Sequence, residues 1–429
     1  MPATQHLWPF RLSAGVAVVV FLALVARFWH PVWGFTSFLQ LDASNDEVKI
    51  AAFKTLPVYV YRDTGGYDGL YYAQIAYHPT LQAPELAGAL DNFTYRARRI
   101  LPPALAWLLA FGRPAWIVYV YSTLNIVAWL ALALVLWRLL DVRDWRGWLA
   151  WCGVMFSTGT LASVRLALTD LVALAVLAAA MLAVERSRGR AGAVLMAAAG
   201  LSRETSLVAL GGLVRRPWRS HANLVRAIVA VAPLAVWLLY IQLSFDSHDR
   251  GWANLGRPPG ALIEKLGADV SAVRHNGDWL LTWTTLAATV GLVVQAMYFA
   301  ARPRLDDAWW RIGASYAALM LCLGTTVWEG FPGAATRVPF NLTADPAGYC
   351  YLDGQQQQGL YTRRGDVESS FAEVFHAAHC CRSCAFASVP PRLSCLVFKV
   401  ASGSRALPGD SRVLQKPCSR AGGACHARW

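Results

Sequence analysis

The chain has 429 residues, of which 56% are hydrophobic and only 15% are charged, and it contains 19 Trp. A soluble domain cannot bury this much apolar surface, so a lipid bilayer is the expected solvent and partner. The formal net charge of +13 fits the same class, because Lys and Arg gather in the cytoplasmic loops of membrane proteins. The positive net charge therefore gives no reason to expect a nucleic-acid partner.

Membrane-spanning helices are the first elements to place. A helix needs about 20 mainly apolar residues to cross a hydrocarbon layer roughly 30 Å thick. Segments near this length, with few interior charges, lie at residues 12–33, 114–137, 148–165, 167–184, 224–244, 279–301 and 309–328. Together with shorter re-entrant segments, they predict an all-α, polytopic transmembrane helix bundle of about eight to ten membrane helices.

Arginines in the connecting loops predict the orientation. They form four groups: Arg138, Arg143 and Arg146; Arg186, Arg188 and Arg190; Arg215, Arg216, Arg219 and Arg226; and Arg302, Arg304 and Arg311. We expect all four groups, and the N-terminus, on the cytoplasmic side. Residues 34–113 then form a first extracytoplasmic loop bearing short helices. The apolar run after Arg11 has no small-residue cleavage pattern behind it, so a retained span is expected rather than a signal peptide.

Residues 191–214 do not fit a single crossing. Both flanks are rich in Arg, yet the segment is long enough to cross only once. A pair of half-length helices that enter from the cytoplasm, turn at residues 201–205 and return would keep the charge pattern. Residues 100–112 are also short, and Pro102 and Pro103 favour a helix start there.

The chain changes character near residue 340. Residues 1–339 form the expected membrane domain, whereas residues 340–429 are a Cys-rich segment of low order with a Gln355–Gln358 run and a Cys381-x-x-Cys384 motif. Three interpretations fit: translation in another reading frame, a disordered native tail, or a metal module. A second well-spaced Cys pair is missing, so no zinc site is expected.

The chemistry is expected in the loop 34–113. Asp63 and Asp68 lie there among glycines and tyrosines, which include Tyr67 and Tyr71. An aspartate can take a proton from an acceptor hydroxyl or hold a metal, and tyrosine can stack on a sugar ring. The alternative for Asp68 is an ordinary turn residue before Gly69.

Three arginines follow in the same loop, Arg96, Arg98 and Arg99, and they are candidates for binding a donor phosphate. Interfacial anchoring is the alternative. Near the membrane, Asp170 opens an apolar helix and is either a first-turn residue or a residue lining a cavity. Arg203 and Glu204 are expected to pair with each other or to line the cavity.

Four short motifs carry a resemblance to a known family: YDGLYY at 67–72, YRARRILPPALA at 95–106, LTD at 168–170 and LSRET at 201–205. In these motifs and in its layout the chain resembles bacterial polytopic glycosyltransferases of GT-C type over residues 10–340. The resemblance implies a polyprenyl-phosphate-linked sugar as donor, the bacterial inner membrane as location and Asp68 as the loop carboxylate, with Asp63 second. The loop has no Asp-x-Asp pair, so a divalent metal stays open as the cofactor.

The expected function is therefore transfer of a sugar from a polyprenyl phosphate to an unknown acceptor at the extracytoplasmic face. A transporter or flippase is one alternative, which the turn at 201–205 would suit as a broken helix. A scaffold without catalysis is the other.

Overall fold

A computed structural model describes residues 8–62, 64, 66–140, 142–245, 255–275 and 279–329. The Cys-rich segment 340–429 lies outside these residues. The first half of the described chain contains α1 (Trp8–Ala26), η2 (Thr36–Leu39), η3 (Ala43–Asn45), α2 (Ala51–Thr55), α3 (Gly69–Tyr77), α4 (Pro84–Ala89), α5 (Phe93–Ala97), α6 (Leu101–Leu109), α7 (Pro114–Leu139), α8 (Trp145–Met155) and α9 (Thr158–Arg165). The second half contains α10 (Asp170–Glu185), α11 (Gly189–Ser202), η4 (Glu204–Leu213), α12 (His221–Ser244), α13 (Gly260–His275), α14 (Trp279–Ala301), α15 (Ala308–Leu321) and α16 (Thr325–Glu329).

The predicted all-α class is confirmed for the described residues. Four segments are helical, long and apolar enough to cross a membrane: Trp8–Ala26, Pro114–Leu139, His221–Ser244 and Thr282–Ala301. Three of these windows are only 17% buried inside the protein, whereas that of α7 is 56% buried. Helix α7 is therefore central, and the other three offer apolar surface to a bilayer. The total of eight to ten membrane helices stays a prediction.

Two predicted spans are wrong as single helices. Residues 148–165 divide into α8 and α9, because the Ser157 side chain accepts a hydrogen bond from the Thr160 N–H and starts a new helix. Residues 309–328 divide into α15 and α16, where Cys322 ends α15 and Leu323 forms an isolated bridge with Leu255. The first span was also placed too far along the chain, since α1 ends at Ala26.

The predicted turn at residues 201–205 is confirmed as a break between two short helices. Helix α11 has 14 residues and ends at Ser202, and the 3-10 helix η4 starts at Glu204. The two pack against each other and against α12. The short helix predicted after residue 100 is also present as α6, which begins with prolines at its first turn.

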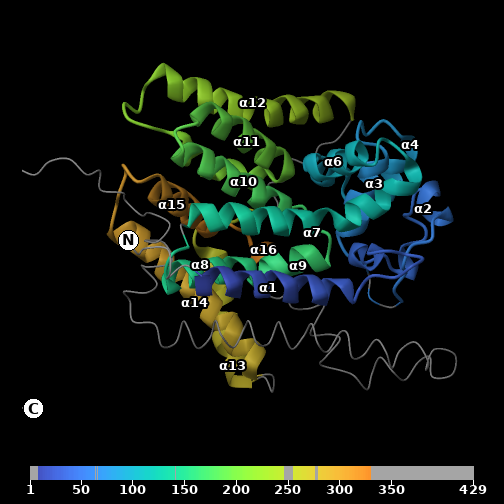
Figure 1. The fold of residues 1–429 in the computed structure, drawn as a ribbon, viewed down its shortest axis with the longest axis horizontal. Coiled ribbons are helices and arrows are strands. Elements are labelled where there is room, and N and C mark those ends of the chain that lie inside the picture. Colours follow the sequence, from blue (N-terminus) through green and yellow to red (C-terminus); the bar gives the residue numbers. More distant parts are fainter. Residues whose placement is uncertain are drawn as a thin grey trace, which may run out of the picture.

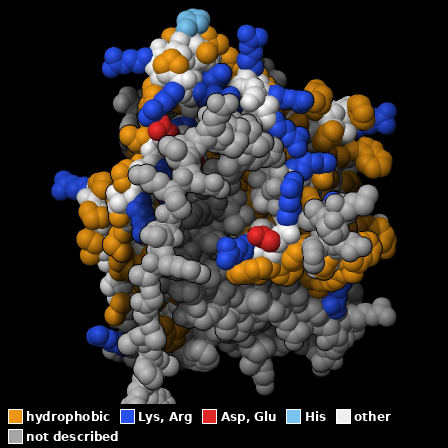
Figure 2. Space-filling model, turned by 60° about the vertical axis from the view of Figure 1, so that its left-hand side comes forward, with side chains coloured by type: hydrophobic (Ala, Val, Ile, Leu, Met, Phe, Trp, Pro, Cys, Tyr) orange, Lys and Arg blue, Asp and Glu red, His pale blue; other side chains and the backbone are white. Residues whose placement is uncertain are grey.

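Helices α1, α7 and α12 lie with roughly parallel axes across Figure 1, with α7 opposite in direction to the other two, and the helices α2–α6 gather at one end of them. Three of the arginine groups meet at the other end. Arg311 donates to the carbonyl oxygens of Gly211 and Val214, and Arg215 donates to that of Val184. Figure 2, in which this end comes forward, shows many Lys and Arg side chains and few acidic ones. This end is therefore rich in basic side chains, and whether it is cytoplasmic stays a prediction.

Candidate functional site

Asp68 lies directly before α3, at the N-cap position of that helix. A carboxylate there commonly accepts a hydrogen bond from the first turn of the helix, but the Asp68 side chain makes no such bond. It is 35% exposed and is bound by Arg96 instead. The interpretation of Asp68 as an ordinary turn or cap residue is therefore not favoured by its contacts.

Gly69 fixes the position of Asp68. A Cβ atom on Gly69 would lie 2.7 Å from the carbonyl oxygen of Leu166 and 3.1 Å from that of Leu39. Only glycine allows this approach of α3 to two backbone segments. The start of α3, and with it Asp68, is thereby held against the loop after α9.

The guanidinium of Arg96 lies between two carboxylates. Its Nη1 and Nη2 atoms are 2.6 and 2.8 Å from the oxygens of Asp68. Its Nε and Nη2 atoms are 2.9 and 2.7 Å from the oxygens of Asp91. The Arg96 side chain is only 7% exposed, so both of its hydrogen-bonding edges are filled. A phosphate could reach this guanidinium only by displacing a carboxylate.

The charge of Arg96 also changes the pKa of Asp91. Burial alone would raise the pKa of Asp91, but the hydrogen bonds and the positive charge of Arg96 outweigh burial and lower it. Both residues of this pair are thus charged at neutral pH, and Arg96 stays fixed beside Asp68.

Arg99 occupies a second enclosed position, next to the first. Its Nη1 atom donates to the Tyr72 hydroxyl at 2.8 Å and its Nη2 atom to the Tyr95 hydroxyl at 2.7 Å. Its Nε atom lies 3.3 Å from Glu204 of η4. Burial raises the pKa of Tyr72, so its hydroxyl stays protonated between Arg96 and Arg99. Arg99 therefore links the loop 34–113 to the break after α11.

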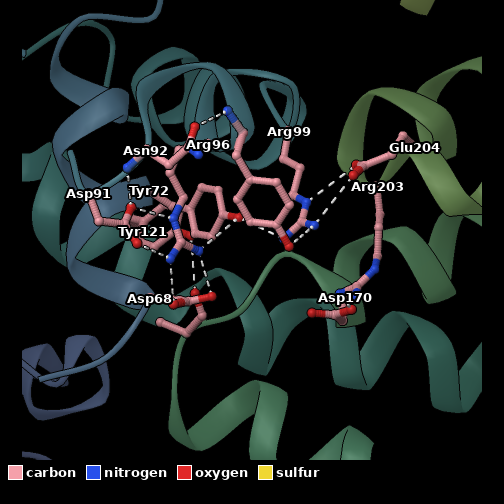
Figure 3. A network of polar contacts seen from close by, with 12 residues as sticks. Asp68, Tyr72, Asp91, Asn92, Arg96, Arg99, Tyr121, Asp170, Arg203 and Glu204 are labelled. Carbon is pink, nitrogen blue, oxygen red and sulfur yellow. Dashed lines mark hydrogen bonds and ion pairs between the residues drawn. The ribbon is translucent and has the colours of Figure 1, made fainter. Parts of the chain in front are cut away.

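Arg203 pairs with Asp170, the first residue of α10, and not with Glu204 as one sequence interpretation expected. The reason is geometric, since the backbone turns at Arg203 and sends Glu204 toward Arg99 (Figure 3). Figure 3 shows the resulting row of charges, from Asp91 and Arg96 through Arg99 and Glu204 to Arg203 and Asp170. Because Asp68 also binds Arg96, all four motifs of the sequence analysis contribute residues to one network.

The other predicted residues have different positions. Tyr71 is half-buried, with the Arg96 guanidinium 4.9 Å above its ring. Tyr67 is half-buried, and its N–H donates to the carbonyl of Gln40. Arg98 is half-buried and follows α5 directly. Asp63 lies outside the described residues.

Metal ligands do not gather in the described part of the chain. No group of three or more His, Cys, Asp or Glu side chains there is arranged to hold a metal ion. The Cys-x-x-Cys motif lies outside this part, so its three interpretations stay open.

Sequence reasoning did not single out three residues that organise the loop. Asp91 is the second carboxylate on Arg96. Arg165, at the end of α9, donates to the Ser37 carbonyl and, at 2.8 Å, to the Tyr61 hydroxyl. Asp42 is only 1% exposed and binds the backbone and the side chain of both Ser44 and Thr64. A charged residue next to an apolar run was a signal for Arg165, but the partners of all three are too distant in sequence to predict.

Replacing Asp42 by Asn should destabilise the loop in a pH-dependent manner. Burial opposes the charge of Asp42, but the hydrogen bonds from Ser44 and Thr64 lower its pKa to about 2, from an ordinary value of 3.8. The carboxylate thus adds about 2 kcal/mol of stability at neutral pH, which is lost as the pH falls from about 4 to about 2. Thermal unfolding in detergent should show a gap between wild type and Asp42→Asn that closes over this range. A gap that stays constant would contradict the assignment.

The fold and the site define a helical protein with four candidate membrane-spanning helices and, at one end, a network of charges built around two buried arginines. Comparisons with protein-family models, with curated proteins and with solved structures give no match for this chain.

Proposed function

We propose that the chain is a membrane-embedded glycosyltransferase that moves a sugar from a polyprenyl phosphate to an acceptor hydroxyl at the extracytoplasmic face. The observation that carries the proposal is the exposure of the Asp68 carboxylate together with its contacts. Its carboxylate is partly exposed, makes no cap to its own helix and is aligned by a buried arginine that a second aspartate holds in place. A partly exposed carboxylate that is fixed in this way suits a general base.

In the proposed step, Asp68 accepts the proton of the acceptor hydroxyl. A bond forms between that oxygen and the anomeric carbon of the sugar, while the bond from the anomeric carbon to the phosphate oxygen breaks. The polyprenyl phosphate leaves with the electron pair and carries the negative charge. Arg96 is a positioning residue here, because its guanidinium fixes the carboxylate of Asp68 and is itself enclosed.

The location of the network supports a lipid-linked substrate. The charges lie where the loop 34–113 meets α10 and the break after α11, at the end opposite the arginine-rich loops. Helix α12 reaches the same loop, since Trp237 donates to the Ala97 carbonyl and Tyr240 to that of Thr80. A substrate with its lipid chain in the bilayer and its headgroup at this end would meet Asp68.

The test compares two aspartates that share one arginine. Asp68→Asn should lower the rate of sugar transfer from a polyprenyl-phosphate sugar by about 100-fold or more, as expected when a general base is lost. Asp91→Asn removes the other partner of Arg96 and should cost less than about tenfold. Equal losses in the two variants would contradict a direct role for Asp68, because they would show that only the support of Arg96 matters.

A transporter or flippase is a second candidate, favoured by one observation. The break between α11 and η4 places Arg203 and Glu204 beside α10, as in the discontinuous helices that line transport sites. In lipid vesicles reconstituted with the purified protein, a transporter would move a lipid-linked sugar between leaflets even when no acceptor is present. The proposed enzyme would instead consume the donor only when acceptor is added.

A further inference from the structure

The three guanidiniums of the network differ in how accessible they are. The side chains of Arg96 and Arg99 are 7% and 6% exposed, and each is bound by several oxygens. The Arg203 side chain is 34% exposed, and among the described residues its side chain pairs with one carboxylate, that of Asp170. A ligand could therefore reach Arg203 by displacing a single carboxylate, whereas at Arg96 or Arg99 it would have to break several hydrogen bonds.

The partner of Arg203 is equally accessible and sits at a helix start. The Asp170 side chain is 36% exposed and belongs to the first residue of the 16-residue helix α10. The first N–H groups of a helix have no partner within it and favour a negative charge. Figure 3 shows Asp170 and Arg203 at one end of the row of charges, away from Asp68.

Unused hydrogen-bonding capacity lies next to this pair. Thr169 stands at the N-cap position of α10 with no side-chain cap. Within the described residues its hydroxyl, in a residue only 1% exposed, has no hydrogen-bond partner. A buried hydroxyl without a partner is costly, and an unfilled ligand position is one explanation for it.

We propose that Arg203 and the start of α10 form the binding site for the donor's phosphate group, and that the Asp170 carboxylate occupies this site until the phosphate arrives. The inference deepens the proposed function, on which it rests, by assigning the phosphate to Arg203 instead of Arg96 and Arg99. The donor's phosphate is a diester with one negative charge, like a carboxylate, but its free oxygens can reach both Arg203 and the unpaired N–H groups at the start of α10. It therefore displaces Asp170, whose carboxylate moves into solvent.

The proposal predicts opposite effects for the two partners of one ion pair. Arg203→Gln removes the cation and should weaken phosphate binding by about tenfold or more. Asp170→Asn removes the competing anion and should tighten binding by about fivefold. A merely structural ion pair would instead make both substitutions weaken binding, or leave it unchanged.

The experiment measures binding of farnesyl phosphate to the full chain in neutral detergent by isothermal titration calorimetry, without acceptor. Arg203→Lys keeps the charge and should retain part of the affinity, which separates loss of the cation from loss of the fold. Arg216→Gln and Asp306→Asn, which alter an exposed pair at the opposite end, are the matched controls and should leave binding unchanged. Inorganic phosphate and uncharged farnesol are titrated in parallel.

Weaker binding with Arg203→Gln together with tighter binding with Asp170→Asn supports the site. If inorganic phosphate binds as well as farnesyl phosphate, the site takes free phosphate, and if it binds far more weakly, the site takes the lipid headgroup. Unchanged binding with Arg203→Gln, or equal weakening by both substitutions, overturns the inference. Binding is independent of transfer, so loss of activity with Asp68→Asn and failure of this test are distinguishable.

Discussion

Replacing Arg96 by Gln should destabilise the protein by about 3 kcal/mol, because the substitution leaves two carboxylates facing each other without a cation. Asp68 and Asp91 lie within 2.6 and 2.7 Å of the Arg96 nitrogens. Their side chains are 35% and 41% exposed, so water relieves part of the repulsion and keeps the cost near the lower end for a broken buried pair. The measurement is the midpoint of thermal unfolding in detergent.

Two further variants sharpen this prediction. Arg96→Lys should destabilise the protein less than Arg96→Gln does but still measurably, because an ammonium group keeps the charge but cannot bind two carboxylates in bidentate geometry. Arg216→Gln is the control, since Arg216 is 70% exposed in its pair with Asp306 and surface pairs contribute little. Full stability of the Arg96→Lys protein would show that charge alone, without the fork geometry, holds the two aspartates.

Replacing Gly69 by Ala is expected to displace Asp68 and to cost about 2 kcal/mol or more. The atoms that a Cβ would meet are backbone atoms of Leu166 and Leu39, which cannot move aside as a flexible side chain can. Either α3 shifts away or the loop after α9 does, and in both cases the carboxylate of Asp68 leaves its place beside Arg96. The rate of sugar transfer should therefore fall even under conditions in which the Gly69→Ala protein stays folded.

Gly88 provides the matched control for this substitution. It lies in the short helix α4, and nothing stands within 4 Å of the position where its Cβ would be. Gly88→Ala should leave stability unchanged or raise it by up to about 1 kcal/mol, since alanine favours a helix. If Gly69→Ala and Gly88→Ala behave alike, the close approach of α3 does not constrain Asp68.

Much of the helical layout could be predicted from the sequence, because apolar length alone identifies a membrane helix. Pro114–Leu139 and His221–Ser244 are long, mainly apolar segments, and both appear as long helices. The break after α11 was predictable from charge, since Arg on both flanks excludes a single crossing. Hydropathy cannot reveal where an apolar run breaks. Ser157 starts a new helix inside one such run, and only its capping geometry shows the division.

The candidate site was predictable as a set of motifs but not as a set of pairs. Asp68, Arg96, Arg99, Asp170, Arg203 and Glu204 were each identifiable as charges in or beside an apolar region. Their partners depend on where loops far apart in the chain meet, as with Arg99 and Glu204, which are 105 residues apart. Glu204 thus binds Arg99 and not its neighbour Arg203, and Asp91 emerges as the second support of Arg96.

The central claim is that Asp68 works on the extracytoplasmic face, opposite the arginine-rich loops. The most direct measurement introduces single cysteines at the exposed residues Glu47, in the loop 34–113, and Ser187, between α10 and α11, after replacing the native cysteines. Intact cells are then treated with a membrane-impermeant maleimide. Labelling at position 47 and not at position 187 is the predicted result, whereas labelling at 187 alone would place Asp68 in the cytoplasm and contradict the account.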